Sequence, residues 1–176
     1  MIMIETERLI LRQITVDDWR DLQRIAGNDD VAPMTARLKS PWSEAEVKAW
    51  INDRCTPHVM GAFLAICLRD GSLVGSIGTG VDTDDQAFLG YFVGKPHWGQ
   101  GIASEAMVAI LDYTFTTYPI DAISASCFVD NHASLHVLDK MGFEKYGEEL
   151  GLSAARLEPA QLFLYRLTRT KFESLS

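Results

Sequence analysis

The feature that most constrains this chain is a junction at residues 89–106, where a strand-like apolar run passes through a glycine turn directly into a helix. The turn is Trp98-Gly99-Gln100-Gly101-Ile102-Ala103. Apolar residues then recur at the spacing of one buried helical stripe: Met107, Ile110, Leu111 and Phe115. Two glycines two positions apart let successive backbone N–H groups converge, and the helix N-terminus adds partial positive charge. The junction predicts an anion-binding turn, although a plain tight turn with close helix packing stays open.

Two common phosphate-binding patterns do not fit this turn. A dinucleotide-binding turn has a third glycine where this chain has Ser104, and an acidic residue ending the next strand, which here runs from Ile123 to Val129 without one. A P-loop has a lysine followed by serine or threonine after its last glycine, and the turn lacks both. What remains is a diphosphate-binding turn within a mixed sheet.

Strands and helices are predicted along the rest of the chain. Apolar runs bounded by turn residues predict strands at Leu9–Ile14, Ala62–Leu68, Leu73–Val81, Ala87–Val93, Ile123–Val129 and Leu162–Leu167. Capping residues and helical spacing predict helices that start at Thr15, Ser43, Gly101 and Asp130 or Asn131. The first two should end near Ala26 and Arg54, and Pro119 and Gly142 should close the others.

The order of these elements predicts the fold class. A helix separates the fourth and fifth strands, so these should pair in parallel through a right-handed crossover. We expect an α/β (α+β) fold with a mixed central sheet and flanking helices, as a single domain over residues 1–176. Its first half should be antiparallel, with the parallel pair between strands four and five.

Charge and hydropathy narrow the class of protein. Sixteen basic and 24 acidic residues give a net charge of −8, which argues against nucleic-acid binding and favours a cationic partner. The apolar run at residues 61–68 is too short to cross a membrane, and the N-terminus lacks a signal-peptide pattern. Together these features predict a cytoplasmic protein that binds neither nucleic acid nor membranes.

The cysteines and histidines predict no metal site. Cys55, Cys67 and Cys127 lack Cys-x-x-Cys spacing, so we expect free thiols, with Cys67 and Cys127 buried in strands. His132 and His136 are one helical turn apart, but no nearby carboxylate or cysteine completes a zinc site, and a solvated helix face is expected instead.

The glycine turn resembles the cofactor turn of the GNAT superfamily of N-acetyltransferases, Gln/Arg-x-x-Gly-x-Gly/Ala. Residues 98–103 match it, with Trp98 in place of the first Gln or Arg. The opening residues 5–12 are similar to the RimJ/RimL-like branch, the ribosomal-protein-alanine N-acetyltransferases. So are Asn131-x-x-Ser134 and Lys140-x-Gly142-Phe143. The resemblance covers about residues 4–146.

This resemblance implies that acetyl-CoA is bound as a co-substrate where strands four and five splay apart. The pantetheine arm would hydrogen-bond to the backbone of Phe92 and Val93 like an added strand. The pyrophosphate would meet the N–H groups of residues 100–104, and Asn131 would cap the next helix, donate to the cofactor, or do both. The cofactor-binding residues implied are Phe92, Val93, Trp98, Gly99, Gln100, Gly101, Ile102, Ala103, Ser104 and Asn131.

The resemblance also implies acetyl transfer to a primary amine, either a protein N-terminus or a small cationic amine, by direct attack on the thioester. The backbone N–H of Val93 would stabilise the oxyanion. Many family members carry a tyrosine acid where this chain has Leu138, so the expected thiolate partner is Ser134. The alternative for Ser134 is a first-turn serine that satisfies a backbone N–H. The general base stays unassigned between Tyr91, Glu105 and water.

Two further questions stay open at the level of sequence. The missing tyrosine is compatible with a CoA-binding sensor or interaction domain that has no catalytic activity. The acceptor would be selected by residues 29–42 and by the segment after Phe143, where the pattern is least informative. Both a monomer and a homodimer are compatible with the sequence.

Overall fold

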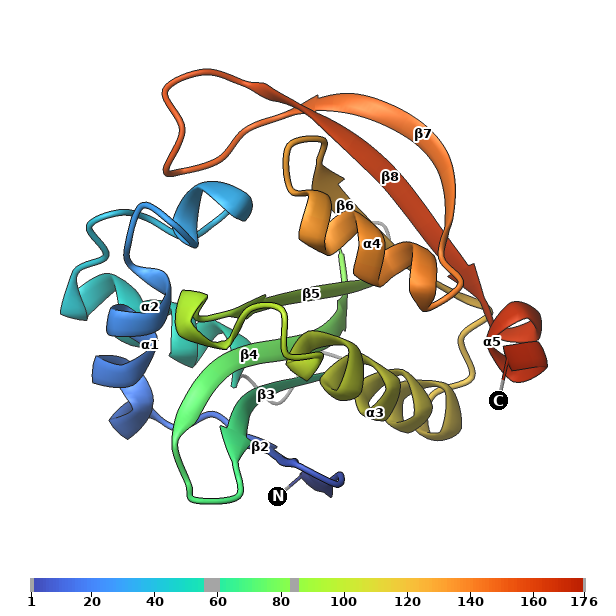
Figure 1. Ribbon diagram of the computed structural model, residues 1–176, viewed down its shortest axis with the longest axis horizontal. Helices are drawn as coiled ribbons and strands as arrows, with labels where there is room; N and C mark the ends of the chain where they lie inside the picture. Colours follow the sequence, from blue (N-terminus) through green and yellow to red (C-terminus); the bar gives the residue numbers. More distant parts are fainter. Residues whose placement is uncertain (1, 56–60, 83–85, 176) are drawn as a thin grey trace.

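The computed structural model describes residues 2–55, 61–82 and 86–175, which form a sheet with helices on both faces (Figure 1). The strands are β1 (Met3–Glu5), β2 (Leu9–Gln13), β3 (Ala62–Leu68), β4 (Leu73–Val81), β5 (Ala87–Val93), β6 (Ala122–Phe128), β7 (Glu144–Gly151) and β8 (Ala160–Thr168). The helices are α1 (Trp19–Ala26), α2 (Glu44–Arg54), α3 (Ile102–Thr117), α4 (His132–Lys140) and α5 (Arg169–Leu175). Short 3-10 helices are η1 (Val16–Asp18), η2 (Ala32–Met34) and η3 (Lys95–His97).

The sheet is mixed, as predicted. Its described strands follow the order β1-β2-β3-β4-β5-β6-β8-β7, and every neighbouring pair is antiparallel except β5 and β6. The parallel pairing of β5 with β6 has one aligned pair, Phe88 with Ser124. The predicted α/β class, mixed sheet and parallel pair are therefore confirmed, with strands four and five of the prediction corresponding to β5 and β6.

Local sequence signals fix several of the helix ends. Ser43 and Glu46 form the predicted capping box, in which the Glu46 carboxylate accepts from Ser43 N at 3.0 Å. The carboxylate of Asp18 accepts from Thr15 N at 2.8 Å before η1 and α1. Gly142 follows α4 with a φ of 83°, the left-handed conformation expected there.

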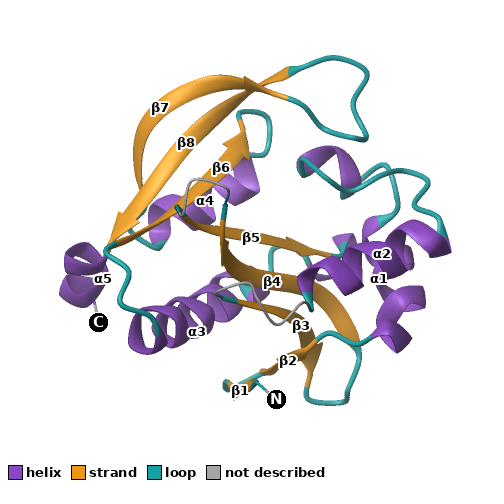
Figure 2. Cartoon of the chain, turned by 180° about the vertical axis from the view of Figure 1, so that it is seen from behind, coloured by secondary structure: helices purple, strands orange, loops and turns teal. Residues whose placement is uncertain are grey.

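Two apolar clusters lie on opposite faces of the sheet. Helix α3 buries its predicted stripe against one face, together with Ala87, Leu89 and Val93 of β5. Helices α1 and α2 cover the other face, where Phe92 of β5 is buried (Figure 2). The side chains of β5 therefore alternate between the two helical layers, and this alternation positions the candidate site.

The C-terminal part differs from the prediction. The predicted last strand, Leu162–Leu167, is the middle of a longer β8, which pairs with an unpredicted β7. The connection between β7 and β8 reaches the segment around η2, where Ser153 Oγ donates to Thr35 O at 2.7 Å. None of the helices in the described part of the chain is long and apolar enough to span a membrane.

Candidate active site

The predicted anion-binding turn connects β5 to α3. Gly99 and Gly101 both have left-handed backbone, with φ of 72° and 77°, and Gly101 is the N-cap of α3. Glycine tolerates this conformation, and it has no side chain that could cap the first N–H groups of the helix. These N–H groups of residues 102–104, with the helix dipole behind them, can bind an anion. A cradle formed by backbone groups fits a pyrophosphate.

Trp98, the departure from the family pattern, anchors this turn to the end of β5. Its indole Nε1 donates to Val93 O at 2.7 Å, while 44% of the residue stays exposed. The side chain of Gln100 bonds back to η3, because Nε2 donates to Pro96 O at 3.0 Å. Trp98, at the first position of the turn, thus contributes to the shape of the turn and offers no polar side chain to a ligand.

A second anchor comes from the connection between β1 and β2 and was not predicted. The carboxylate of Glu105, in the first turns of α3, accepts from Thr6 Oγ1 at 2.6 Å and from Arg8 N and Nε at 2.9 and 2.6 Å. Arg8 Nη1 also donates to Gln100 O at 2.8 Å. Burial would raise the pKa of Glu105, but these bonds outweigh it and the net pKa is lowered. Glu105 is therefore an ionised structural anchor in this structure.

The carboxyl half of β5 borders an opening toward β6. The two strands align at Phe88 and Ser124, and β6 is paired along its length with β8 on its other side. A Cβ built on Gly75 of β4 would lie 2.3 Å from Phe92 O, so that carbonyl points toward β4. Backbone groups of successive strand residues point to opposite sides, so the N–H of Val93 faces the opening. This direction suits the oxyanion role of Val93, which stays a prediction, whereas Phe92 offers its backbone to β4 rather than to the opening.

Ser134 and Tyr91 meet on the α4 side of this opening. Their hydroxyl oxygens are 2.6 Å apart and form a hydrogen bond. Burial raises the pKa of Tyr91 to about 12, which the bond to Ser134 only partly offsets. Burial also raises the pKa of the Cys127 thiol, and a hydrogen bond with Ser134 opposes this shift. The Ser134 hydroxyl is thus bonded to a phenol that stays protonated near neutral pH.

Asn131 caps α4. Its Oδ1 accepts from Ser134 N at 3.2 Å, which confirms the capping alternative and fixes the side chain at the start of the helix. This bond uses the oxygen of the amide, so the donation to a cofactor that was also considered would come from Nδ2. The predicted contact and the observed cap are therefore compatible through different atoms.

Comparison with known proteins identifies the family. The model described as "Acetyltransferase (GNAT) domain" matches residues 8–144. This chain belongs to the GNAT acetyltransferase family. The match includes the glycine turn, Asn131 and Ser134, so the family predicted from these motifs is confirmed, while the RimJ/RimL-like branch stays a prediction.

Relatives and solved structures agree with this assignment. The GNAT chain is 33% identical over 150 residues to the uncharacterized N-acetyltransferase YoaA of Bacillus subtilis, covering 82% of this chain and 84% of that protein. Its fold is similar to Mycobacterium smegmatis RimJ in complex with CoA-disulfide, with a TM-score of 0.79, 23% identity and coverage of 92% and 82%. It is also similar to Vibrio cholerae spermidine N-acetyltransferase with CoA and spermine, with a TM-score of 0.80, 17% identity and coverage of 96% and 99%.

The structure brings most of the predicted residues of this GNAT chain together. The turn follows the carboxyl end of β5, beyond its one aligned pair with β6, and Tyr91 of the same strand bonds to Ser134 of α4. Leu138, at the place of the usual tyrosine, is 1% exposed and belongs to the apolar core. Trp42 is likewise core, whereas Trp50 is half-buried and contacts Phe92 at 6.1 Å between ring centroids.

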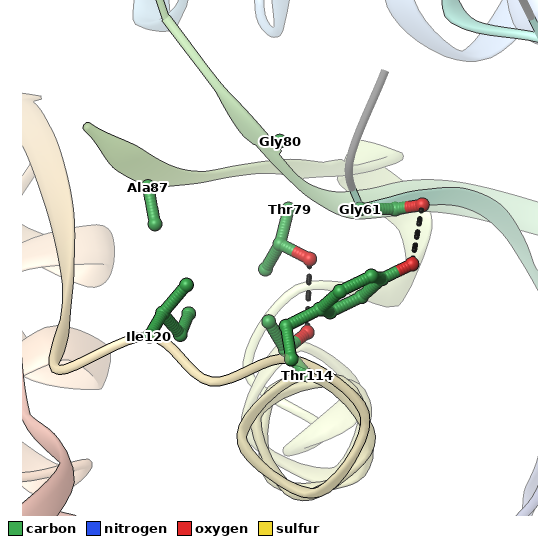
Figure 3. A pocket seen from close by; sticks show the side chains of 7 residues that line it. Gly61, Thr79, Gly80, Ala87, Thr114 and Ile120 are labelled. Atoms are coloured by element: carbon green, nitrogen blue, oxygen red, sulfur yellow. Dashed lines mark hydrogen bonds between the residues drawn. The ribbon is translucent and has the colours of Figure 1, made fainter. Parts of the chain in front are cut away.

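A separate small cavity lies at the opposite end of α3 (Figure 3). Thr79 and Thr114 join their hydroxyls across it at 2.9 Å, and Tyr118 Oη donates to Gly61 O at 3.4 Å. Its volume of about 10 Å³ is near the minimum for one water molecule. It is too small for an amine substrate and lies away from the glycine turn.

Proposed function

We propose that this chain is an acetyl-CoA-dependent N-acetyltransferase that moves an acetyl group to a primary amine of a protein N-terminus or a small molecule. The observation that carries this proposal is the Tyr91–Ser134 hydroxyl pair at 2.6 Å, beside the same opening that ends in the glycine turn. A protein that only bound the cofactor would need the turn but not a hydroxyl pair at the other end of the opening.

The residues that would hold acetyl-CoA are the backbone of the turn and of β5. N–H groups of residues 100–104 would bind the pyrophosphate, and the backbone of Val93 would pair with the pantetheine arm. When bound, acetyl-CoA supplies an activated acetyl thioester. The N–H of Val93 would stabilise negative charge on the reacting oxygen, and such a donor is worth about 3–4 kcal/mol.

Ser134 would hold the proton needed by the departing sulfur. Because the pKa of Tyr91 is raised to about 12, its phenol stays protonated near neutral pH and can donate to Ser134 Oγ. As the C–S bond breaks, Ser134 Oγ would give its proton to the sulfur and take the proton of Tyr91 Oη, and the proton lost by the amine on forming the C–N bond would pass to solvent, from which Tyr91 is reprotonated. We therefore propose Ser134 as the acid and Tyr91 as the group that orients it.

The fold neighbours support an amine acceptor without fixing which one. The Vibrio cholerae neighbour is a spermidine N-acetyltransferase, and the solved structure with RimJ contains CoA-disulfide. The rest of the proposal is a single domain over residues 1–176 that works in the cytoplasm, as a monomer or homodimer, with its cysteines as free thiols.

The test is release of coenzyme A from acetyl-CoA with a panel of amines, for the wild type, Ser134→Ala and Ser72→Ala. Ser72 lies exposed in the β3–β4 turn and serves as the matched control. Ser134→Ala should lower turnover about a hundredfold, while its thermal stabilisation by acetyl-CoA stays at the wild-type value. Full turnover in Ser134→Ala would refute the role of the hydroxyl. Stabilisation by acetyl-CoA without turnover for any amine would favour the CoA-binding sensor.

A further inference from the structure

The face of β5 opposite Ser134 is open at Gly90. Alternation along the strand directs Tyr91 to the α3 and α4 side, and Gly90 and Phe92 to the α1 and α2 side. Gly90 is exposed, and a Cβ built on it would meet no atom within 4 Å. Its partner on β4 is Gly78, which also lacks a side chain. An amine that attacks from the face opposite the Ser134 hydroxyl would approach across this position.

Arg54, the last residue of α2, stands beside this face among aromatic rings. Its guanidinium carbon lies 4.1 Å from the centroid of Trp50 and 5.3 Å from that of Phe63. Trp50 in turn contacts Phe92 of β5, with 6.1 Å between centroids. Phe63 contacts Phe88 of β5, also at 6.1 Å. Both rings that hold the guanidinium thus rest on the β5 side chains that flank Gly90.

The charge of Arg54 is poorly matched in the described part of the chain. Its side chain is 13% exposed, yet its partners there are Trp50 O at 3.4 Å and a carboxylate oxygen of Asp53 at 3.6 Å. Asp53 is itself 72% exposed. Burial and the nearby positive charge of Arg37 lower the pKa of Arg54 to about 10. A guanidinium this buried ordinarily has a carboxylate at hydrogen-bond distance.

The Arg12–Asp18 pair of the same chain shows the ordinary arrangement. There two nitrogens of the guanidinium meet the two carboxylate oxygens at 2.7 and 2.9 Å. A role at the helix C-terminus would explain a cation at position 54, but a surface position satisfies that role. It would explain neither burial against two rings nor a second arginine close by.

We propose that Arg54 binds an anionic group of the acceptor, a carboxylate or a phosphate, so that the substrate is an amine that also carries an anion. This rests on the proposed acetyltransferase function and names its substrate class. It reverses the expectation drawn from the net charge of −8, because a total charge does not say which sign lies beside the site. Planar guanidinium groups bind both anions in bidentate fashion.

The experiment compares amines in matched pairs that differ by the anion. The pairs are tyrosine with tyramine, 6-aminohexanoate with hexylamine, and phosphoethanolamine with ethanolamine, so the arms separate carboxylate from phosphate and short from long spacing. The proteins are the wild type, Arg54→Met and Arg24→Met. Methionine keeps an unbranched apolar chain over Trp50 without the charge, and Arg24 is a 68% exposed arginine of α1 that serves as control.

Two readouts are taken for every pair: kcat/KM for coenzyme A release, and thermal unfolding with each amine in the presence of coenzyme A. We expect the member of at least one pair that carries the carboxylate or phosphate to exceed its partner without it by about tenfold or more in kcat/KM. That preference should disappear in Arg54→Met and persist in Arg24→Met, with the amine that lacks the anionic group little changed. The unfolding shifts should follow the same pattern.

The second readout separates this proposal from the proposed function. Anion-dependent stabilisation that Arg54→Met abolishes, without turnover in any arm, would support the binding site and count against acetyl transfer. The proposal is overturned if the amine without the anionic group is preferred in every pair, if the preference for the anionic group survives in Arg54→Met, or if neither readout distinguishes the members of any pair.

Discussion

Replacing Gly101 by glutamate tests the cofactor turn, and Gly71 offers a matched control. Both glycines have left-handed backbone, with φ of 77° and 89°. A residue with a side chain pays about 1–2 kcal/mol for that conformation, so each variant should unfold about 2–8 °C lower than the wild type. Gly71 lies in the β3–β4 turn with no atom within 4 Å of its built Cβ. Gly71→Glu therefore isolates the strain.

The two variants should differ in their response to acetyl-CoA. A Cβ at position 101 would lie 3.4 Å from Arg8 Nη2, at the N-terminus of α3. A carboxylate there would compete with the pyrophosphate for the N–H groups and for Arg8, and we expect affinity to fall at least about a hundredfold, the effect of losing about 2.7 kcal/mol. At about 100 times the wild-type Kd, stabilisation would drop from about 2.7 to about 0.4 kcal/mol.

Thermal unfolding with and without acetyl-CoA measures this difference, with ATP and NAD as control ligands. For a domain of this size the wild type and Gly71→Glu should shift by about 5–10 °C, and Gly101→Glu by about 1 °C. Equal shifts in the two variants would refute the reasoning that this turn binds the cofactor. So would an ATP shift in the wild type as large as that of acetyl-CoA.

Four further substitutions test the contacts of the turn and of Asp18. Gln100→Ala should keep the rise in unfolding temperature that acetyl-CoA causes, because the side chain of Gln100 bonds to Pro96 O and not to the ligand. Arg8→Met should reduce that rise, because it removes the bonds that hold Gln100 O and the Glu105 carboxylate. Trp98→Phe should lower kcat/KM for acetyl-CoA, since it removes the bond to Val93 O, while Tm falls by no more than about 2–6 °C. Asp18→Asn should cost about 2 kcal/mol at pH 7 in denaturant unfolding, because Asp18 accepts bonds from Arg12 and Thr15. Burial would raise the pKa of Asp18, but those bonds hold it below its ordinary value, so the stabilisation is complete above the unfolded pKa near 4 and is lost as pH falls through the lower native pKa. A wild-type advantage that persisted undiminished at pH 2 would contradict that account.

Local patterns predicted the elements that bury a face or carry a cap. Strands β3, β4 and β5 have the predicted bounds because each buries apolar side chains between turn residues. The Ser43–Glu46 box and Gly142 marked helix ends because their chemistry acts within four residues. The strand β7 escaped prediction because most of its residues are exposed, and its place depends on pairing with β8 rather than on an apolar face.

The parts of the site that sequence could not reveal depend on distant partners. Glu105 was one candidate for the general base, but its carboxylate bonds to Thr6 and Arg8, 99 and 97 residues away. Tyr91 meets Ser134 across 43 residues, which gave Ser134 a partner that no local spacing shows. Such contacts arise when the sheet assembles, so single-residue patterns carry no trace of them.

The alternation of β5 explains why one strand can serve both halves of the proposed reaction. Sulfur must leave on the side where a proton is available, and the amine must reach the carbonyl carbon without competing for that space. Tyr91 faces α4 and Gly90 faces α2, so the strand itself separates the two groups. Its pairing with β4 is regular from Val81–Ala87 to Gly75–Val93, which fixes this assignment. A shift of one residue would turn the phenol toward α2 and the open glycine toward Ser134, and both roles would be lost together.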